Sequence, residues 1–225
     1  MAAPGTAWAL YPTLAAADAL HTDAAWTEPA CQSRRRALAA YMWALAERLD
    51  VPDAHQLVVA AALVCVQRLW SGWLAPSARD EEVVTAACLF LAAKANDAPL
   101  KLKRVAAAAQ TTPETLVRAE FDALSVLAFE TQVRLPHPLL PVLMRRLGME
   151  PDQWPAVYAR AWRLALACGH SAACVVWSAR ALAAATLHGA LAHDQLGPWM
   201  AALEAWAREQ GEDPAAVWRC LQTLK

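Results

Sequence analysis

Apolar residues recur every three or four positions over most of the chain, which is the spacing of one face of an α-helix. From Ser33 to about Leu49, for example, Leu38, Met42 and Leu45 repeat in this way, and Ser33 is a residue type that caps helix N-termini. The first half of the chain predicts five helices, over residues 33–49, 52–70, 80–94, 102–109 and 112–127.

Helix start signals support these boundaries and continue into the second half. Thr112, Pro113 and Glu114 combine a capping hydroxyl, a proline in the first turn and an acidic residue at the positive end of the helix dipole. Asp152 and Asp213 are capping candidates farther along the chain. The second half predicts helices near 138–147, 152–168, 173–188, 196–209 and 213–223.

A proline-rich joint, LPHPLLP at 135–141, separates the two sets of helices. We find no stretch that alternates apolar and polar residues over the length of a strand. The pattern therefore predicts an all-α protein with two tandem five-helix bundles. We expect an N-terminal extension over 1–32, a first bundle over 33–131 and a second over 132–225.

The helix near 80–94 has no polar side between Glu82 and Lys94, where it reads EVVTAACLFLAAK. A helix that is apolar all round must be surrounded by other helices, so we expect it to be the central helix of its bundle. The segment 172–191 of the second half has the same character, with Arg180 as its one charge.

Composition adds helical bias and excludes several function classes. The 225 residues are 58% hydrophobic and 18% charged with 7 glycines, and the net charge of −1 provides no general attraction for nucleic acid. The N-terminus lacks the basic start of a secretory signal, and the apolar runs are too short or too polar to span a bilayer. We expect a soluble intracellular protein whose six cysteines are reduced thiols, with a disulfide framework as the alternative.

Two stretches, AACLFLAAKANDAPLKLKRV at 86–105 and ETLVRAEFDALSVLAFE at 114–130, resemble the cyclin box. The shared pattern is a small-residue helix that ends in Ala-Lys, an acidic elbow, a short basic helix, and a glutamate followed by apolar residues and Phe. The resemblance covers about 34–129 and continues more loosely through LPHPLLPVLMRRLG. It is closer to transcription-type cyclins, those similar to cyclins C, K, L, Q and T, than to mitotic ones.

The resemblance implies a set of kinase-binding residues. Lys94 matches the family's kinase-contacting lysine and Glu120 its partner glutamate, while Leu124 and Phe129 match apolar positions that receive the kinase's regulatory helix. Glu120 and Leu124 are four residues apart and therefore share a helix face. Other interpretations remain open: Lys94 as a helix C-terminal cation, Glu120 as a solvated residue or a partner of Arg118, and Leu124 and Phe129 as core.

The match to the family pattern is incomplete in three places. The family often has two acids after the lysine, where this chain has Asn96 and Asp97. The family's first-helix arginine, which braces the box, is one of the three arginines at 34–36, with a polar partner expected near Gln67. The stretch RRALAAYMW only partly matches the docking patch of mitotic cyclins, so we do not expect docking of Arg-x-Leu substrates.

Other candidate chemistry is weaker. Cys168, His170 and Cys174 have no fourth ligand nearby, so we expect no metal, and phosphate loops, serine elbows and paired catalytic acids are missing. Lys101, Lys103 and Arg104 form either a solvated face or a contact to a partner or a phosphate. Most of the eleven tryptophans are expected in the core, with some on a partner surface.

The resemblance implies a non-catalytic regulatory subunit that binds and activates a cyclin-dependent protein kinase, in transcription or cell-cycle control and in the nucleus. We expect no cofactor, no direct nucleic-acid contact and no membrane association. The alternative is a cyclin-fold general transcription factor similar to factor IIB, which would bind promoter DNA and TATA-binding protein. That alternative predicts an upstream zinc ribbon and a basic groove, which a near-neutral chain does not favour.

Overall fold

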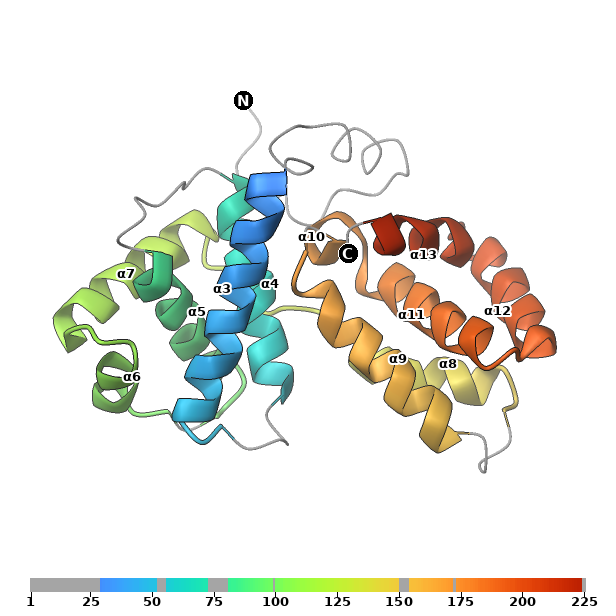
Figure 1. The fold of residues 1–225 in the computed structure, drawn as a ribbon, viewed down its shortest axis with the longest axis horizontal. Coiled ribbons are helices and arrows are strands. Elements are labelled where there is room, and N and C mark those ends of the chain that lie inside the picture. Colours follow the sequence, from blue (N-terminus) through green and yellow to red (C-terminus); the bar gives the residue numbers. More distant parts are fainter. Residues whose placement is uncertain are drawn as a thin grey trace. The chain divides into compact units, whose positions relative to one another are not determined.

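The computed structural model describes residues 29–51, 56–72, 81–98, 100–149, 154–171 and 173–223. Regular structure in these residues is helical throughout, which confirms the predicted all-α class (Figure 1). The chain divides into two compact units, Met1–Arg134 and Leu135–Lys225. Each described helix is either too short or too polar to cross a membrane.

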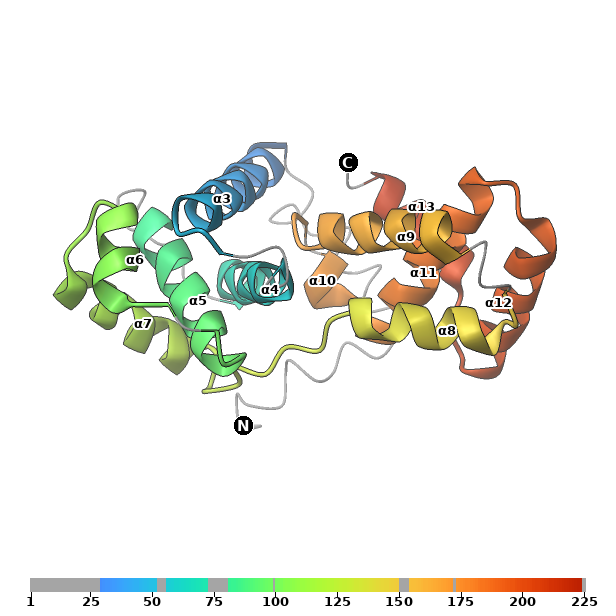
Figure 2. The ribbon, with the colours of Figure 1, turned by 90° about the horizontal axis from the view of Figure 1, so that it is seen from below.

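The first unit is built around one buried helix. Residues 85–93 of this helix are all buried, and it packs against the four other described helices of its unit (Figure 2). Its many alanines allow neighbouring backbones to approach closely, as the apolar pattern predicted. The five helices are α3 (Pro29–Arg48), α4 (Gln56–Gly72), the central α5 (Glu81–Ala95), α6 (Leu102–Ala108) and α7 (Pro113–Val126).

Three of the predicted helix starts fall within the described residues of this unit, and the start at Leu102 is confirmed by α6. The predicted cap at Ser33 is wrong, because α3 already begins at Pro29; proline needs no hydrogen-bond partner in a first helical turn. The Thr112 cap is confirmed, since the Thr115 amide donates to Thr112 Oγ1 at 3.2 Å. The starts proposed at 52–53, 80 and 152 lie outside the described residues.

Hydrogen bonds and a cation–π contact connect α3 to the rest of the first unit. Arg35 is the arginine that braces the bundle: its Nη1 donates to Gln67 Oε1 of α4 at 2.5 Å, and both side chains are buried. Arg34 Nε donates to Glu81 Oε2 at 2.8 Å, and its guanidinium lies 4.9 Å from the centre of the Trp70 ring. These contacts tie α3 to α4 and to the first turn of α5.

The second unit has its own buried central helix, α11 (Ala179–His193), whose residues 181–191 are all buried. The single helix predicted over 173–188 is wrong: α10 (Ala173–Val176) ends, and α11 begins after Ser178, whose Oγ accepts from the Ala181 amide at 3.0 Å. The Asp213 cap is confirmed by a 2.9 Å bond from the Ala216 amide. The other elements are the 3-10 turn η3 (His137–Leu139), α8 (Leu140–Arg146), α9 (Trp154–Cys168), α12 (Gly197–Glu209) and α13 (Pro214–Thr223).

His137, in the proline-rich joint, lies in the core of the second unit. Its ring is buried and meets the Trp162 ring edge-on, with the ring centres 4.5 Å apart. Burial lowers the pKa of His137 to about 4, because the imidazolium loses its hydration there. The neutral ring is therefore the form that fits the folded unit.

We predict that His137 makes the second unit acid-sensitive. Unfolded histidine titrates near pH 6.5. Between about pH 6.5 and pH 4 the unfolded chain therefore binds a proton that the folded chain does not. Stability from this group is fully present above pH 6.5 and is lost as the pH falls through this window, by up to roughly 3 kcal/mol.

Urea unfolding followed by tryptophan fluorescence at pH 7.5 and pH 4.5 measures this loss. His137→Leu should flatten the pH dependence relative to the native chain, since all other titrating groups are shared by both proteins. Equal slopes for the two proteins would contradict the assignment.

Close packing at Gly189 gives a second prediction. A Cβ at this position of α11 would lie 2.6 Å from atoms of the Trp218 ring on α13, so the ring or the helix must move. We expect Gly189→Ala to destabilise the second unit by about 1–3 kcal/mol, as overpacking does. Gly197→Ala is the matched control, because a Cβ there meets nothing within 4 Å; thermal melts in which both variants behave alike would refute the prediction.

Candidate functional site

The most unusual polar contact of the first unit joins the end of α5 to the middle of α7. Lys94 Nζ forms an ion pair with Glu120 Oε1. The Glu120 side chain is 8% exposed, whereas the Lys94 side chain is 50% exposed. A buried carboxylate without a cation would be strongly unfavourable, so Lys94 compensates Glu120 while its ammonium stays within reach of solvent. Glu120 is therefore a buried ion-pair partner, and its interpretation as a solvated residue is wrong.

Two features hold Lys94 in place. Its Nζ lies 4.5 Å from the centre of the Phe90 ring, one turn earlier on α5, which favours a cation–π interaction. Its position in the last turn of the helix also places the positive charge at the negative end of the helix dipole. The helix-terminus interpretation and the ion pair thus apply to the same side chain.

The residues after Lys94 form the turn that ends α5. Asn96 Nδ2 donates to the Ala92 carbonyl at 2.8 Å, and Asp97 has a φ of 53°, in the left-handed region that Asp and Asn tolerate better than most residues. The Ala98 amide then closes the turn onto the Ala93 carbonyl at 2.8 Å. Asn96, where the family often has an acid, is used as a helix cap.

The C-terminus of α7 brings Leu124 and Phe129 together. The Phe129 amide donates to the Leu124 carbonyl at 2.9 Å and the Ala128 amide to the Ser125 carbonyl at 3.2 Å, which is the Schellman pattern of helix ends. Ala128 and Phe129 have φ values of 50° and 61°, a strained conformation for two consecutive non-glycine residues. Phe129 is 64% exposed, so its interpretation as core is wrong, whereas Leu124 is half-buried.

Sequence reasoning missed two exposed apolar residues on the same helix. Val117 is 46% and Phe121 is 63% exposed. The signal was present, because Val117, Phe121 and Leu124 repeat at the spacing of a helix face and lie beside the buried row that contains Glu120. One row is enough for packing against the core, so the second row, with Val117, Phe121 and Leu124, exceeds what core packing requires.

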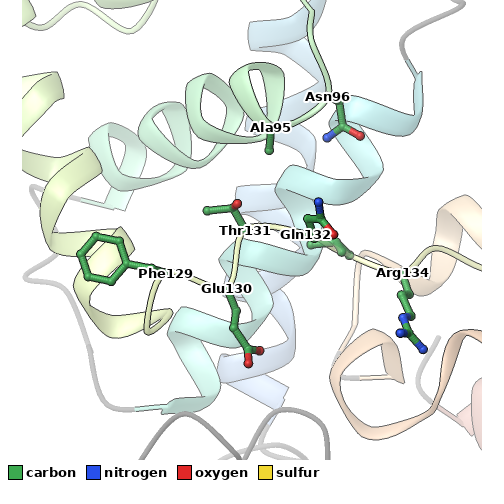
Figure 3. Close-up of a pocket in the computed structure, with 8 residues that line it drawn as sticks. Ala95, Asn96, Phe129, Glu130, Thr131, Gln132 and Arg134 are labelled. Carbon is green, nitrogen blue, oxygen red and sulfur yellow. The ribbon is translucent and has the colours of Figure 1, made fainter.

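An open pocket lies beside this site, where the chain leaves α7 and passes the end of α5. Ala95 and Asn96 line one side, and residues 129–134 line the other. Figure 3 shows Thr131 below Ala95, and the Phe129 ring directed away from the extended segment. Glu130 and Arg134 are exposed, so the pocket rim carries both charge signs.

The remaining candidates have local structural roles. Cys168 Sγ donates to the Leu164 carbonyl and Cys174 Sγ to the Ser171 carbonyl, each at 3.3 Å, and burial raises the pKa of Cys168 to about 12. Nowhere in the described residues do three His, Cys, Asp or Glu side chains gather so as to hold a metal ion.

The three basic residues at the start of α6 have two different roles. Arg104 Nη2 donates to the Leu49 carbonyl at 3.3 Å and contacts Asp50 Oδ2 at 3.4 Å, so it fastens α6 to the end of α3. Lys101 and Lys103 are exposed. Arg104 therefore has a structural role, while the two lysines stay at the surface.

Comparisons with known proteins show which solved structures have a similar architecture. No curated protein matches the chain in sequence. A viral cyclin from herpesvirus saimiri has a similar solved structure, with a TM-score of 0.68 and 19% identity over 86% of this chain and 83% of the viral one. A chain of the yeast TFIIK (Kin28/Ccl1/Tfb3) complex is similar with a TM-score of 0.64 and 17% identity, covering 86% of this chain and 84% of that chain. At these identities the likeness concerns the fold.

The sequence itself gives the family. The model of the family described as "Cyclin, N-terminal domain" matches residues 19–132, which is half of the chain and includes Lys94, Glu120, Leu124 and Phe129. The all-α architecture agrees with it. The chain therefore belongs to the cyclin family.

Proposed function

We propose that this protein is a non-catalytic regulatory subunit that binds and activates a cyclin-dependent protein kinase. The observation that carries the proposal is the Lys94–Glu120 pair, in which a half-exposed ammonium stands over a buried carboxylate beside exposed apolar side chains. Membership of the cyclin family supports this function, and one of the two similar solved structures is named as a viral cyclin.

The docking chemistry follows from the site. An ammonium has three N–H donors, and the Lys94 side chain is half-exposed beside Glu120, so it can also meet carbonyl or carboxylate groups of a partner. Leu124 and Phe129 provide apolar surface next to that charge. An amphipathic helix of the kinase fits this arrangement, with apolar residues on Leu124 and Phe129 and a polar acceptor at Lys94.

Binding of the kinase to this surface would be sufficient to activate the kinase. A regulatory helix held against this surface would stay in its inward position, where it completes the kinase's own lysine–glutamate ion pair and orients the phosphates of ATP. The kinase supplies the nucleotide site and the magnesium. This chain supplies a rigid surface, and it needs no cofactor for that role.

We further propose a transcription-type role in the nucleus, without direct contact to nucleic acid or membrane. The His137-Pro138 start of the second unit and the fold shared with a chain of the yeast TFIIK complex support it. The net charge of −1 agrees with a protein partner rather than DNA.

Charge reversal tests the kinase interface. In the double variant Lys94→Glu/Glu120→Lys, an ion pair can still form, so we expect the helical fold to persist. The surface then presents the opposite charge to the kinase, and kinase recovery should fall at least about tenfold, since buried interfacial ion contacts are worth several kcal/mol. Affinity purification from native cells with mass spectrometry measures the recovery, and circular dichroism checks the fold.

The matched control exchanges two exposed charges on α12 of the second unit, in Arg208→Glu/Glu209→Arg. This variant should retain the kinase. Full kinase recovery with the Lys94/Glu120 variant would refute the interface, and recovery of promoter DNA with TATA-binding protein in place of a kinase would favour the factor IIB-like alternative.

A further inference from the structure

We infer that Val117 and Phe121 extend the kinase-docking surface along α7 and select which kinase this protein binds. The inference rests on the proposed function and goes beyond the four residues that match the family pattern. It assigns these two side chains to a partner kinase that carries a matching apolar surface next to its regulatory helix.

Exposed apolar side chains are concentrated on this part of the molecule. The large hydrophobic residues that are exposed in the described residues are Val117 (46%), Phe121 (63%), Phe129 (64%) and Val142 (55%). Three of these four lie on α7 or directly after it. Single exposed apolar residues are common on protein surfaces, whereas a contiguous group marks a binding surface.

The helix geometry makes these residues one continuous strip. Leu116, Glu120 and Ala123 form the buried row of α7. Successive residues of a helix are about 100° apart, so Val117, Phe121 and Leu124 form a second row directly beside it. This row is about 10 Å long, and the Schellman turn then adds Phe129 at its C-terminal end. We call Val117, Phe121, Leu124 and Phe129 the apolar strip.

The borders of the strip identify the occupant as a protein surface. Exposed Glu114, Arg118 and Asp122 flank it on the outer side, and the Lys94–Glu120 pair lies on the inner side. Both charge signs alternate there, which suits a polar protein rim and gives no net attraction to an anionic membrane. The strip is continuous with the ion pair, so one amphipathic kinase helix can cover both.

The strip is too small to hold a partner alone. A stable homodimer buries about 800 Å² on each subunit, through some twenty residues, and four side chains fall well short of this. Together with Lys94 and the pocket formed by residues 129–134, it becomes part of a larger surface for a single partner. A second copy of this chain would need a further surface that the strip does not provide.

Selectivity between kinases follows from the apolar character of Val117 and Phe121. Lys94, Leu124 and Phe129 would accept the regulatory helix of kinases in general. A kinase that places a polar or charged group over Phe121 would lose hydration there without gaining a hydrogen bond, and it would bind more weakly. Phe121 thus disfavours such kinases. With a kinase that has an apolar surface at this position, its ring adds contact area.

The test compares Phe121→Gln and Val117→Gln with the native chain, in native cells, with the recovered kinase identified and quantified by mass spectrometry. We expect about tenfold lower kinase recovery for Phe121→Gln and a smaller loss for Val117→Gln. Both side chains are exposed, so the melting temperature should stay within a few degrees of the native value. Val142→Gln is the matched control, because it makes the same change at an exposed valine of the second unit.

The outcomes separate this inference from the proposed function. Kinase lost in the Lys94→Glu/Glu120→Lys variant but retained in full by Phe121→Gln and Val117→Gln would overturn the inference and leave the proposed function standing. The absence of any kinase from the native sample would overturn both. Light scattering on the purified chain that showed a dimer, dissociated by Phe121→Gln, would also overturn the inference in favour of self-association.

Discussion

The first unit of this protein depends on one constraint: α5 has no polar face. Residues 85–93 are all buried, so four other helices must surround them, and Thr85 is the one polar side chain along that length. The helix therefore reaches solvent only near its two ends, at Glu82 in the first turn and at Lys94 in the last. The position of the one exposed cation of this helix is a consequence of how completely the rest of the helix is buried.

The buried carboxylate of Glu120 adds the second half of the site. It stabilises Lys94 in one place and orients it, at the cost of its own desolvation, which the pair must offset. Such an arrangement contributes little net stability. It does fix a charge at the border of an apolar surface, and this is the property that partner recognition requires. In the docking that we propose, the fixed charge and the apolar strip would define both the register and the orientation of an amphipathic helix of the partner.

Helix ends decide the details around this site. The turn after α5 uses Asn96 and Asp97 for capping, and the turn after α7 holds Ala128 and Phe129 at positive φ. The strained turn after α7 directs Phe129 into solvent rather than into the core. Turn geometry of this kind depends on hydrogen bonds between residues three to five apart, and glycine, its usual sequence signal, is missing at these positions.

The sequence by itself determined the all-α class, the two buried central helices and the helical spacing that pairs Glu120 with Leu124, because these follow from local periodicity and from the absence of a polar face. The family resemblance selected Lys94 and Glu120, and their charges alone could not. Only the tertiary structure decided that these two side chains meet, that Arg35 is the arginine bonded to Gln67, and that Phe129 and Phe121 are exposed. It also split the helix expected over 173–188 at Ser178. The physical reason is that these features depend on contacts between helices and on capping bonds at helix ends, whereas periodicity reports only which face of a helix is apolar.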